Sequence, residues 1–68
     1  MSKDLKYMHS VLEWVQNFHG MQPEEIFEHF GSRQNFENAC ALARNASVDS
    51  YQMATSTAEE IYKNRLQN

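Results

Sequence analysis

Three histidines and one cysteine are the residues of this sequence best suited to chemistry. His9, His19 and His29 recur at intervals of ten residues, so no two of them share one helical face within a single element. Glu25 and His29 have the four-residue spacing of helical metal ligands, and Cys40 could join them after folding. Structural zinc usually takes four ligands dominated by Cys and His. We therefore expect no metal site, and interpret His19 and His29, each just before a glycine, as residues that stabilise helix C-termini.

Covalent and acid/base catalysis are the other chemistry that these residue types could perform. Cys40 lies in the stretch "NACALA", on the apolar face of an expected helix, where burial raises the pKa of a thiol and leaves it inert. An acid/base group could be formed by Glu24, Glu25 and Glu28. However, these residues lie at an expected helix start, where negative charge is favourable beside the exposed N–H groups of the first turn. We expect no catalytic residue, no cofactor and no enzymatic activity.

Composition narrows the partners and the compartment. The 68 residues include nine Asp and Glu against six Lys and Arg, a net charge of -3, and the basic residues are scattered. This balance does not form the positive surface that phosphate backbones or anionic lipids require, so it disfavours nucleic acid and membrane as partners. A single cysteine is typical of a reducing compartment, and no apolar run has the length of a leader or a membrane span. We expect a cytoplasmic protein.

The elements that must position these residues are all helical. The only proline and both glycines fall between residues 20 and 31, where they separate helices. Pro23 suits a first helical position, Ser32 suits an N-cap, and either Ser47 or Asp49 can cap the last helix. No segment alternates as a strand does. The sequence predicts one all-α domain over residues 1–68, a small bundle of four helices at 3–19, 23–30, 33–45 and 48–66, the second short.

Two of these helices have one expected inner face each. On the third helix that face consists of one large and several small residues, which are Phe36, Ala39, Cys40 and Ala43, with Leu42 alongside. On the fourth helix it runs to the C-terminus, through Val48, Tyr51, Ala54, Ala58, Ile61, Tyr62 and Leu66.

The first helix has two adjacent apolar stripes. The first stripe consists of Leu5, Met8, Leu12 and Val15, and the second of Tyr7, Val11, Trp14 and Phe18. Together they cover roughly 180° of the circumference, more than the roughly 100° that a surface helix needs. Either other helices of the same chain cover both stripes, or one stripe meets another chain; the sequence leaves both interpretations open.

The second interpretation makes the first helix a contact surface. Trp and Tyr are enriched at interface hot spots, and a chain this short has little core of its own. We therefore expect a homo-oligomer or a protein partner. The candidate interface residues are Tyr7, Val11, Trp14 and Phe18, together with Met53 on the otherwise polar side of the fourth helix.

These observations favour a protein that acts by binding. We expect a small acidic inhibitor or regulator of a larger macromolecule that works as a homo-oligomer. In size and composition the chain is similar to the short helical proteins with which bacteriophages and mobile elements block host enzymes or defence systems. That similarity implies an accessory or counter-defence role.

A small-nucleotide-binding protein is the first alternative. The stretch "MATSTAEE" looks like part of the helical phage proteins that sequester cyclic nucleotides, although the basic positions of those proteins are not evident here. An oligomer could form the ligand pocket at its subunit interface. Tyr51 or Tyr62, or equally Tyr7 or Trp14, would stack a base. The phosphate would be held by basic residues, for which the candidates are Arg44, Lys63 and Arg65.

A DNA-binding regulator is the second alternative. Residues 41–60 resemble a helix-turn-helix, with a tight turn near Asn45 between two helices. Residues 50–60 offer Gln52 to a base but contain no Lys or Arg, and they end in Glu59 and Glu60. This composition disfavours DNA as the partner.

Overall fold

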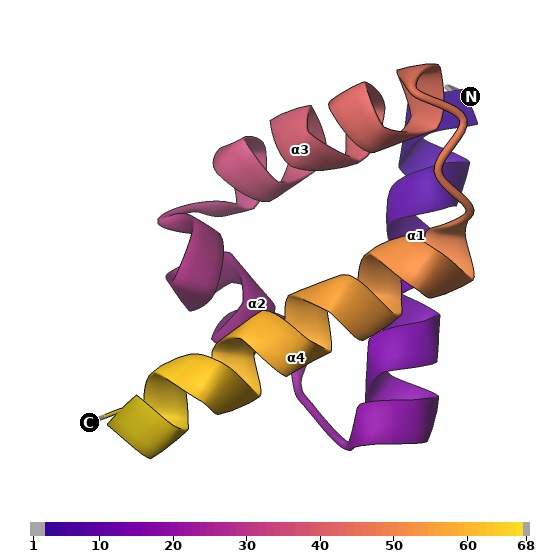
Figure 1. Cartoon of the computed structure of the whole chain (residues 1–68). Helices are drawn as coiled ribbons and strands as arrows, with labels where there is room; N and C mark the ends of the chain where they lie inside the picture. The colour runs from indigo at the N-terminus through magenta and orange to yellow at the C-terminus, as the bar shows by residue number, and fades with distance from the viewer. Residues whose placement is uncertain (1–2, 68) are drawn as a thin grey trace.

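The chain folds into a small bundle of four helices. The computed structural model describes residues 3–67, in which α1 (Lys3–His19), α2 (Pro23–Phe30), α3 (Arg33–Asn45) and α4 (Ser50–Gln67) are the helices and no strand occurs (Figure 1). The predicted all-α fold is confirmed, and the first three helices have the predicted bounds. The fourth begins two residues later than predicted.

The late start of α4 follows from how α3 ends. Ser47 has a φ of 61°, in the left-handed region, and its N–H donates to the carbonyl of Arg44 at 3.0 Å. The N–H of Val48 donates to the carbonyl of Ala43 at 2.9 Å. These two bonds form a Schellman motif, in which Ser47 takes the position that usually holds glycine. Ser47, one of the two candidate caps of the fourth helix, therefore closes the third.

The other candidate cap begins α4. The Asp49 side chain accepts a hydrogen bond from the N–H of Tyr51 at 3.3 Å, and its carbonyl accepts from the N–H of Met53 at 2.9 Å. The N–H of Val48 is part of the hydrogen-bonded end of α3, so Val48 is not in the first turn of α4. Helix α4 therefore begins at Ser50.

The connection between α1 and α2 is short and contains one buried apolar side chain, Met21. Gly20 closes α1 with a φ of 64°, and its N–H donates to the carbonyl of Gln16 at 3.1 Å. Met21 then precedes α2, whose first residue is Pro23. Met21 and Ile26 are both buried, 2% and 0% exposed, at the spacing of a hydrophobic staple. This staple fixes the angle at which α2 leaves the turn.

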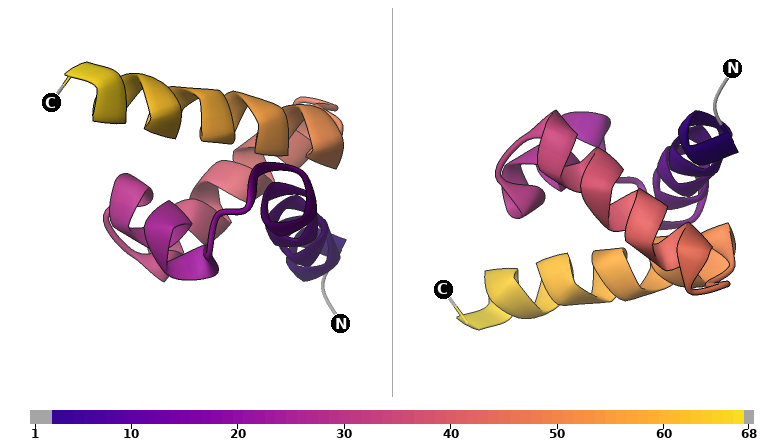
Figure 2. Two further views of the ribbon diagram at one scale, coloured as in Figure 1. Left: turned by 90° about the horizontal axis from the view of Figure 1, so that it is seen from below. Right: turned by 90° about the horizontal axis from the view of Figure 1, so that it is seen from above.

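The core forms where α1 crosses α3 and α4, behind both of them in the view of Figure 1 (Figures 1 and 2). α1 packs mainly against α4 and α3, whereas α2 packs against α3. Phe36 of α3 is the largest fully buried side chain, and small residues of α4 allow that helix to approach closely. The buried apolar residues are Met8, Val11, Val15, Met21, Ile26, Phe36, Cys40, Ala54, Ala58 and Ile61.

Two leucines are exposed although the sequence predicted that they lie on or beside the inner face of a helix. Leu42 of α3 is 72% exposed, because Phe36 and Cys40 turn a narrow face of that helix inward and Leu42 points elsewhere. Leu66 of α4 is 87% exposed, because the C-terminal end of that helix extends past the other helices (Figure 1). The apolar pattern predicted burial at both positions, and at both the prediction is wrong.

Candidate binding surfaces

Three aromatic side chains gather at the seam between α1 and α4. The ring centroids of Trp14 and Phe18 lie 5.2 Å apart, and Tyr51 lies 5.1 Å from Trp14 and 5.9 Å from Phe18, edge-on to both. Such edge-to-face pairs are favourable beyond the area that they bury. Phe18 is nevertheless 61% exposed and Tyr51 45%. We call Trp14, Phe18 and Tyr51 the aromatic surface.

The structure assigns the second stripe of α1 mainly to this seam. Val11 is 0% exposed and belongs to the core, so it is closed to any other chain. Tyr7 and Trp14 are half-buried and pack against the core, and Phe18 alone projects into solvent. Since buried residues come from both stripes, Met8 and Val15 from the first and Val11 from the second, the inner face of α1 lies between them.

The other candidate contact residue, Met53, is half-buried against the core and is not on a free polar face. Of the five interface residues proposed from the sequence, the structure brings together Trp14 and Phe18. It adds Tyr51, which the sequence analysis had placed on the inner face of the fourth helix and among the nucleotide-binding candidates. The signal for Tyr51 was its position near the start of the fourth helix, but its contact with α1 depends on the fold.

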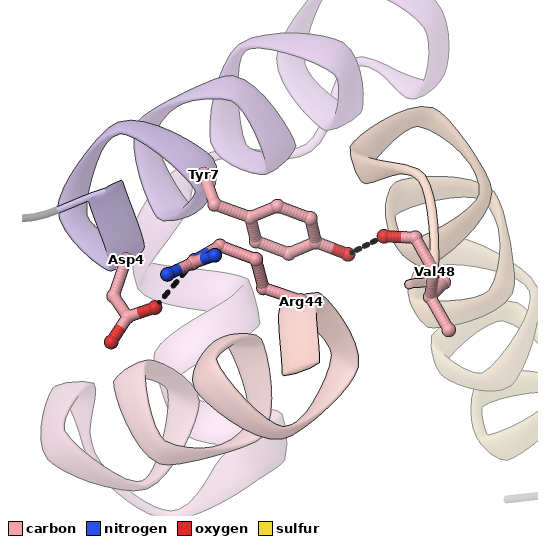
Figure 3. Close-up of polar contacts among 4 residues, drawn as sticks. All are labelled: Asp4, Tyr7, Arg44 and Val48. Carbon is pink, nitrogen blue, oxygen red and sulfur yellow. Dashed lines mark hydrogen bonds and ion pairs between the residues drawn. The ribbon is translucent and has the colours of Figure 1, made fainter. Parts of the chain in front are cut away.

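At the other end of the seam, polar contacts replace aromatic ones (Figure 3). The Tyr7 hydroxyl donates to the carbonyl of Val48 at 2.7 Å, and Arg44 Nε donates to Asp4 Oδ1 at 2.7 Å. Burial raises the pKa of Tyr7, and the negative charges of Cys40 and Asp49 in their ionised forms raise it further. These bonds tie α1 to α3 and to the α3–α4 connection, so Tyr7 and Arg44 have structural roles.

The nucleotide-binding candidates are separated in space. Arg44 pairs with Asp4 beside the start of α1, whereas Lys63 and Arg65 lie near the far end of α4 (Figures 1 and 3). Tyr62 is near the second group, with the Arg65 guanidinium carbon 6.0 Å from its ring centroid, and Tyr51 belongs to the aromatic surface. A single chain does not assemble these residues into one pocket.

A second surface is the hollow between α2 and the C-terminal half of α4, which we call the α2–α4 groove. Its volume is about 360 Å³. An ion pair crosses between the helices, from Arg65 Nη2 to Glu25 Oε1 at 3.1 Å, and His29 Nε2 lies 3.8 Å from Glu60 Oε2. The residues that line it are Glu25, Glu28, His29, Ile61, Asn64 and Arg65. Sequence reasoning missed this groove, because its two walls are more than thirty residues apart in the chain.

The residues suited to chemistry do not come together. Cys40 is 1% exposed, and burial, with a further contribution from the Glu37 charge, raises the pKa of its thiol to about 12. His9 is exposed on α1, while His29 faces Glu60 on α4. Among residues 3–67, no group of three or more His, Cys, Asp or Glu side chains is arranged to hold a metal ion. The neutral, buried thiol has the environment of a core residue.

Compared with known proteins, the chain matches no family model, no curated protein and no solved structure. Within residues 3–67 no helix combines the length and the apolar character that crossing a membrane requires. The function therefore has to be argued from the two surfaces described above.

Proposed function

We propose that this protein acts by binding, as a small inhibitor or regulator of a larger macromolecule, and that it works as a homo-oligomer. The aromatic surface is the contact between copies. The observation that carries this proposal is that Phe18 is 61% exposed although its ring already contacts the rings of Trp14 and Tyr51.

The energetic argument rests on what oligomerisation would bury. Transferring a large apolar side chain from water to a packed interface is favourable by about 1.5–3 kcal/mol, and a symmetric dimer makes that contact twice. Trp14 and Tyr51 hold the Phe18 ring in place, which lowers the entropy cost of ordering it. Aromatic residues of this kind dominate the binding energy of many interfaces.

The small core of the chain supports the same proposal. A domain of 68 residues buries a limited share of its apolar surface, and additional burial between copies is a common source of stability at this size. An inhibitor or regulator needs no catalytic group, which is consistent with a buried Cys40 and separated histidines.

Sedimentation equilibrium across a wide concentration range tests the oligomer. We expect the wild-type protein to be larger than a monomer, and Phe18→Ser to weaken self-association at least tenfold, because a buried phenylalanine contributes about 1.5–3 kcal/mol. Leu42→Ser is the matched control, since Leu42 is 72% exposed on α3, away from the aromatic surface. A wild-type protein that stays monomeric at millimolar concentration, or equal effects of the two substitutions, would contradict the proposal.

A further inference from the structure

Most of the exposed large apolar side chains lie on or beside one face of α4. In the part of the chain that the structure describes, five such side chains are at least 42% exposed, and Phe18 and Tyr51 of the aromatic surface are two of them. Tyr62, 42% exposed, and Leu66, 87% exposed, lie on the same helix as Tyr51. At 3.6 residues per turn, four residues of α4 fall within about 60° of its circumference. We call them the outer stripe of α4: Tyr51, Thr55, Tyr62 and Leu66.

The two ends of the outer stripe are complementary. At one end, Tyr51 and the neighbouring Phe18 form a broad apolar surface that stays largely exposed. At the other end, Leu66 lies where α4 extends past the other helices (Figure 1). These two ends cannot meet within one chain, because they are roughly 22 Å apart along a single helix. A second copy of the chain can bring them together.

An antiparallel second copy of α4 places every large residue of the stripe against a partner. When Leu66 of one copy lies opposite Tyr51 of the other, Tyr62 lies opposite Thr55, because both pairs have the same midpoint along the helix. The large Tyr62 ring then faces a small side chain, and Leu66 reaches Tyr51 and the neighbouring Phe18. A two-fold contact of this kind uses the same residues on both copies and makes each contact twice.

The charged residues beside the stripe fit the same arrangement. Glu59 and Lys63 are both exposed, and they lie one turn apart along one flank of the stripe. In the antiparallel register, the two Glu59 side chains lie near the two-fold axis. Each is within about 8 Å, along the helix axis, of Lys63 of the other copy. Because both side chains are long, the glutamates near the axis can pair with the lysines on either side of them.

We propose that the copies associate through an antiparallel, two-fold pair of α4 helices, in which Leu66 of each copy packs against Tyr51 and Phe18 of the other. The inference rests on the proposed function, that the chain is a homo-oligomer joined at the aromatic surface. It names the segment of the second copy that covers this surface. It also gives the exposed end of α4 an element to pack against.

A substitution at the far end of the stripe tests the pairing. Leu66→Ser should weaken self-association at least tenfold in sedimentation equilibrium, as Phe18→Ser does, because each removes an apolar side chain from the same contact. Leu42→Ser, at a leucine that is 72% exposed on α3, should have little effect. In the dissociated chain Leu66 is exposed, so Leu66→Ser should leave the unfolding of dilute protein nearly unchanged.

Two charge reversals test the two-fold symmetry. Glu59→Lys and Lys63→Glu should each weaken self-association at least tenfold, because each gives the contact charges of one sign on both copies. A mixture of the two variants should associate at least tenfold more tightly than either variant alone, because opposite charges then meet across the contact. Glu13→Lys and Lys6→Glu make the same changes in net charge on exposed positions of α1. Those two should associate like the wild-type protein, both alone and mixed.

Cross-linking distinguishes the antiparallel register from other pairings. In a glutathione redox buffer, Glu59→Cys should form a disulfide-linked dimer, because the two copies of residue 59 lie beside the axis. Lys63→Cys, one turn away on the same flank, should not, because the two copies of residue 63 are more than about 10 Å apart along the helix axis. Cys40 is buried and does not compete.

The oligomer and its geometry fail separately. If the wild-type protein associates and Phe18→Ser weakens it, but Leu66→Ser behaves like Leu42→Ser, the aromatic surface is the contact and the α4 pair is wrong. Equal cross-linking of Glu59→Cys and Lys63→Cys, or a mixture of the charge variants that associates no better than either alone, would also overturn the pair. A wild-type protein that stays monomeric at millimolar concentration overturns both proposals. Circular dichroism verifies that each variant is folded.

Discussion

The two halves of α4 belong to one helix but lie in different environments. Its N-terminal half packs against α1 and buries Ala54, Thr57 and Ala58, while residues 62–67 are exposed throughout (Figure 1). Ile61, 6% exposed, marks the last buried position. Both halves carry apolar residues at helical spacing. Apolar residues at helical spacing therefore make it possible to bury one face of a helix. They are actually buried only where another element packs against that face.

The sharpest test of this comparison removes the last buried apolar side chain of α4 and, separately, an apolar side chain from its exposed end. Ile61→Ala should reduce the free energy of unfolding by about 2–4 kcal/mol, because it deletes buried methyl groups and leaves a cavity. Leu66→Ala should change it by less than about 0.5 kcal/mol, because Leu66 is exposed. Urea denaturation followed by circular dichroism measures both. In protein dilute enough to be dissociated, equal losses of unfolding free energy in the two variants would show that Leu66 is packed against other residues of its own chain and would contradict its exposed environment.

The buried thiol predicts how the core responds to alkaline pH. The pKa of Cys40 is raised to about 12 in the folded protein, from 9.0, so the unfolded chain loses this proton first. The fold is therefore favoured below about pH 9, and its stability falls as pH rises from there toward 12, by roughly 1 kcal/mol at pH 10. Tyr7, whose pKa is also raised, acts in the same direction.

Unfolding free energies measured between pH 7 and 10.5 provide the test. Cys40→Ala should be less stable at pH 7 but should show a shallower decline with pH, so the slopes are compared and not the absolute values. If the free energy of unfolding declines with pH just as steeply in Cys40→Ala, other ionisable groups cause the loss of stability at alkaline pH. Thiol labelling should be fast only in denaturant, because the folded protein buries the sulfur.

The smallest predicted difference concerns two tyrosine hydroxyls. Tyr7 donates to the Val48 carbonyl at 2.7 Å in a partly buried position, and Tyr62, in the exposed half of α4, donates to the His19 carbonyl at 3.1 Å. Tyr7→Phe should cost about 1 kcal/mol, because it leaves a shielded carbonyl without its partner. Tyr62→Phe should cost less than about 0.5 kcal/mol, since water replaces the lost donor. Thermal unfolding of the two variants resolves this difference, and a larger cost at Tyr62 would contradict the environments described here.

The candidate surfaces were only partly predictable. Trp14 and Phe18 were identified as contact residues because large aromatic side chains on a doubled stripe exceed what one helix needs to bury. Val11 belonged to the same stripe but is in the core, because the inner face of α1 lies between its two stripes. The α2–α4 groove could not be predicted, because Glu25 and Arg65 become neighbours only when the chain has folded.

The sequence by itself determined the helices and most of their ends. The helix ends depend on backbone dihedral angles and hydrogen bonds within a few residues, so they can be predicted without knowing the fold. The residues that set them are Gly20, Pro23, Gly31 and Ser32. Only the tertiary structure decided which apolar residues are buried, how α4 divides into two environments and where the α2–α4 groove lies. Those properties depend on which helix lies opposite, and that is set by contacts between residues far apart in the chain.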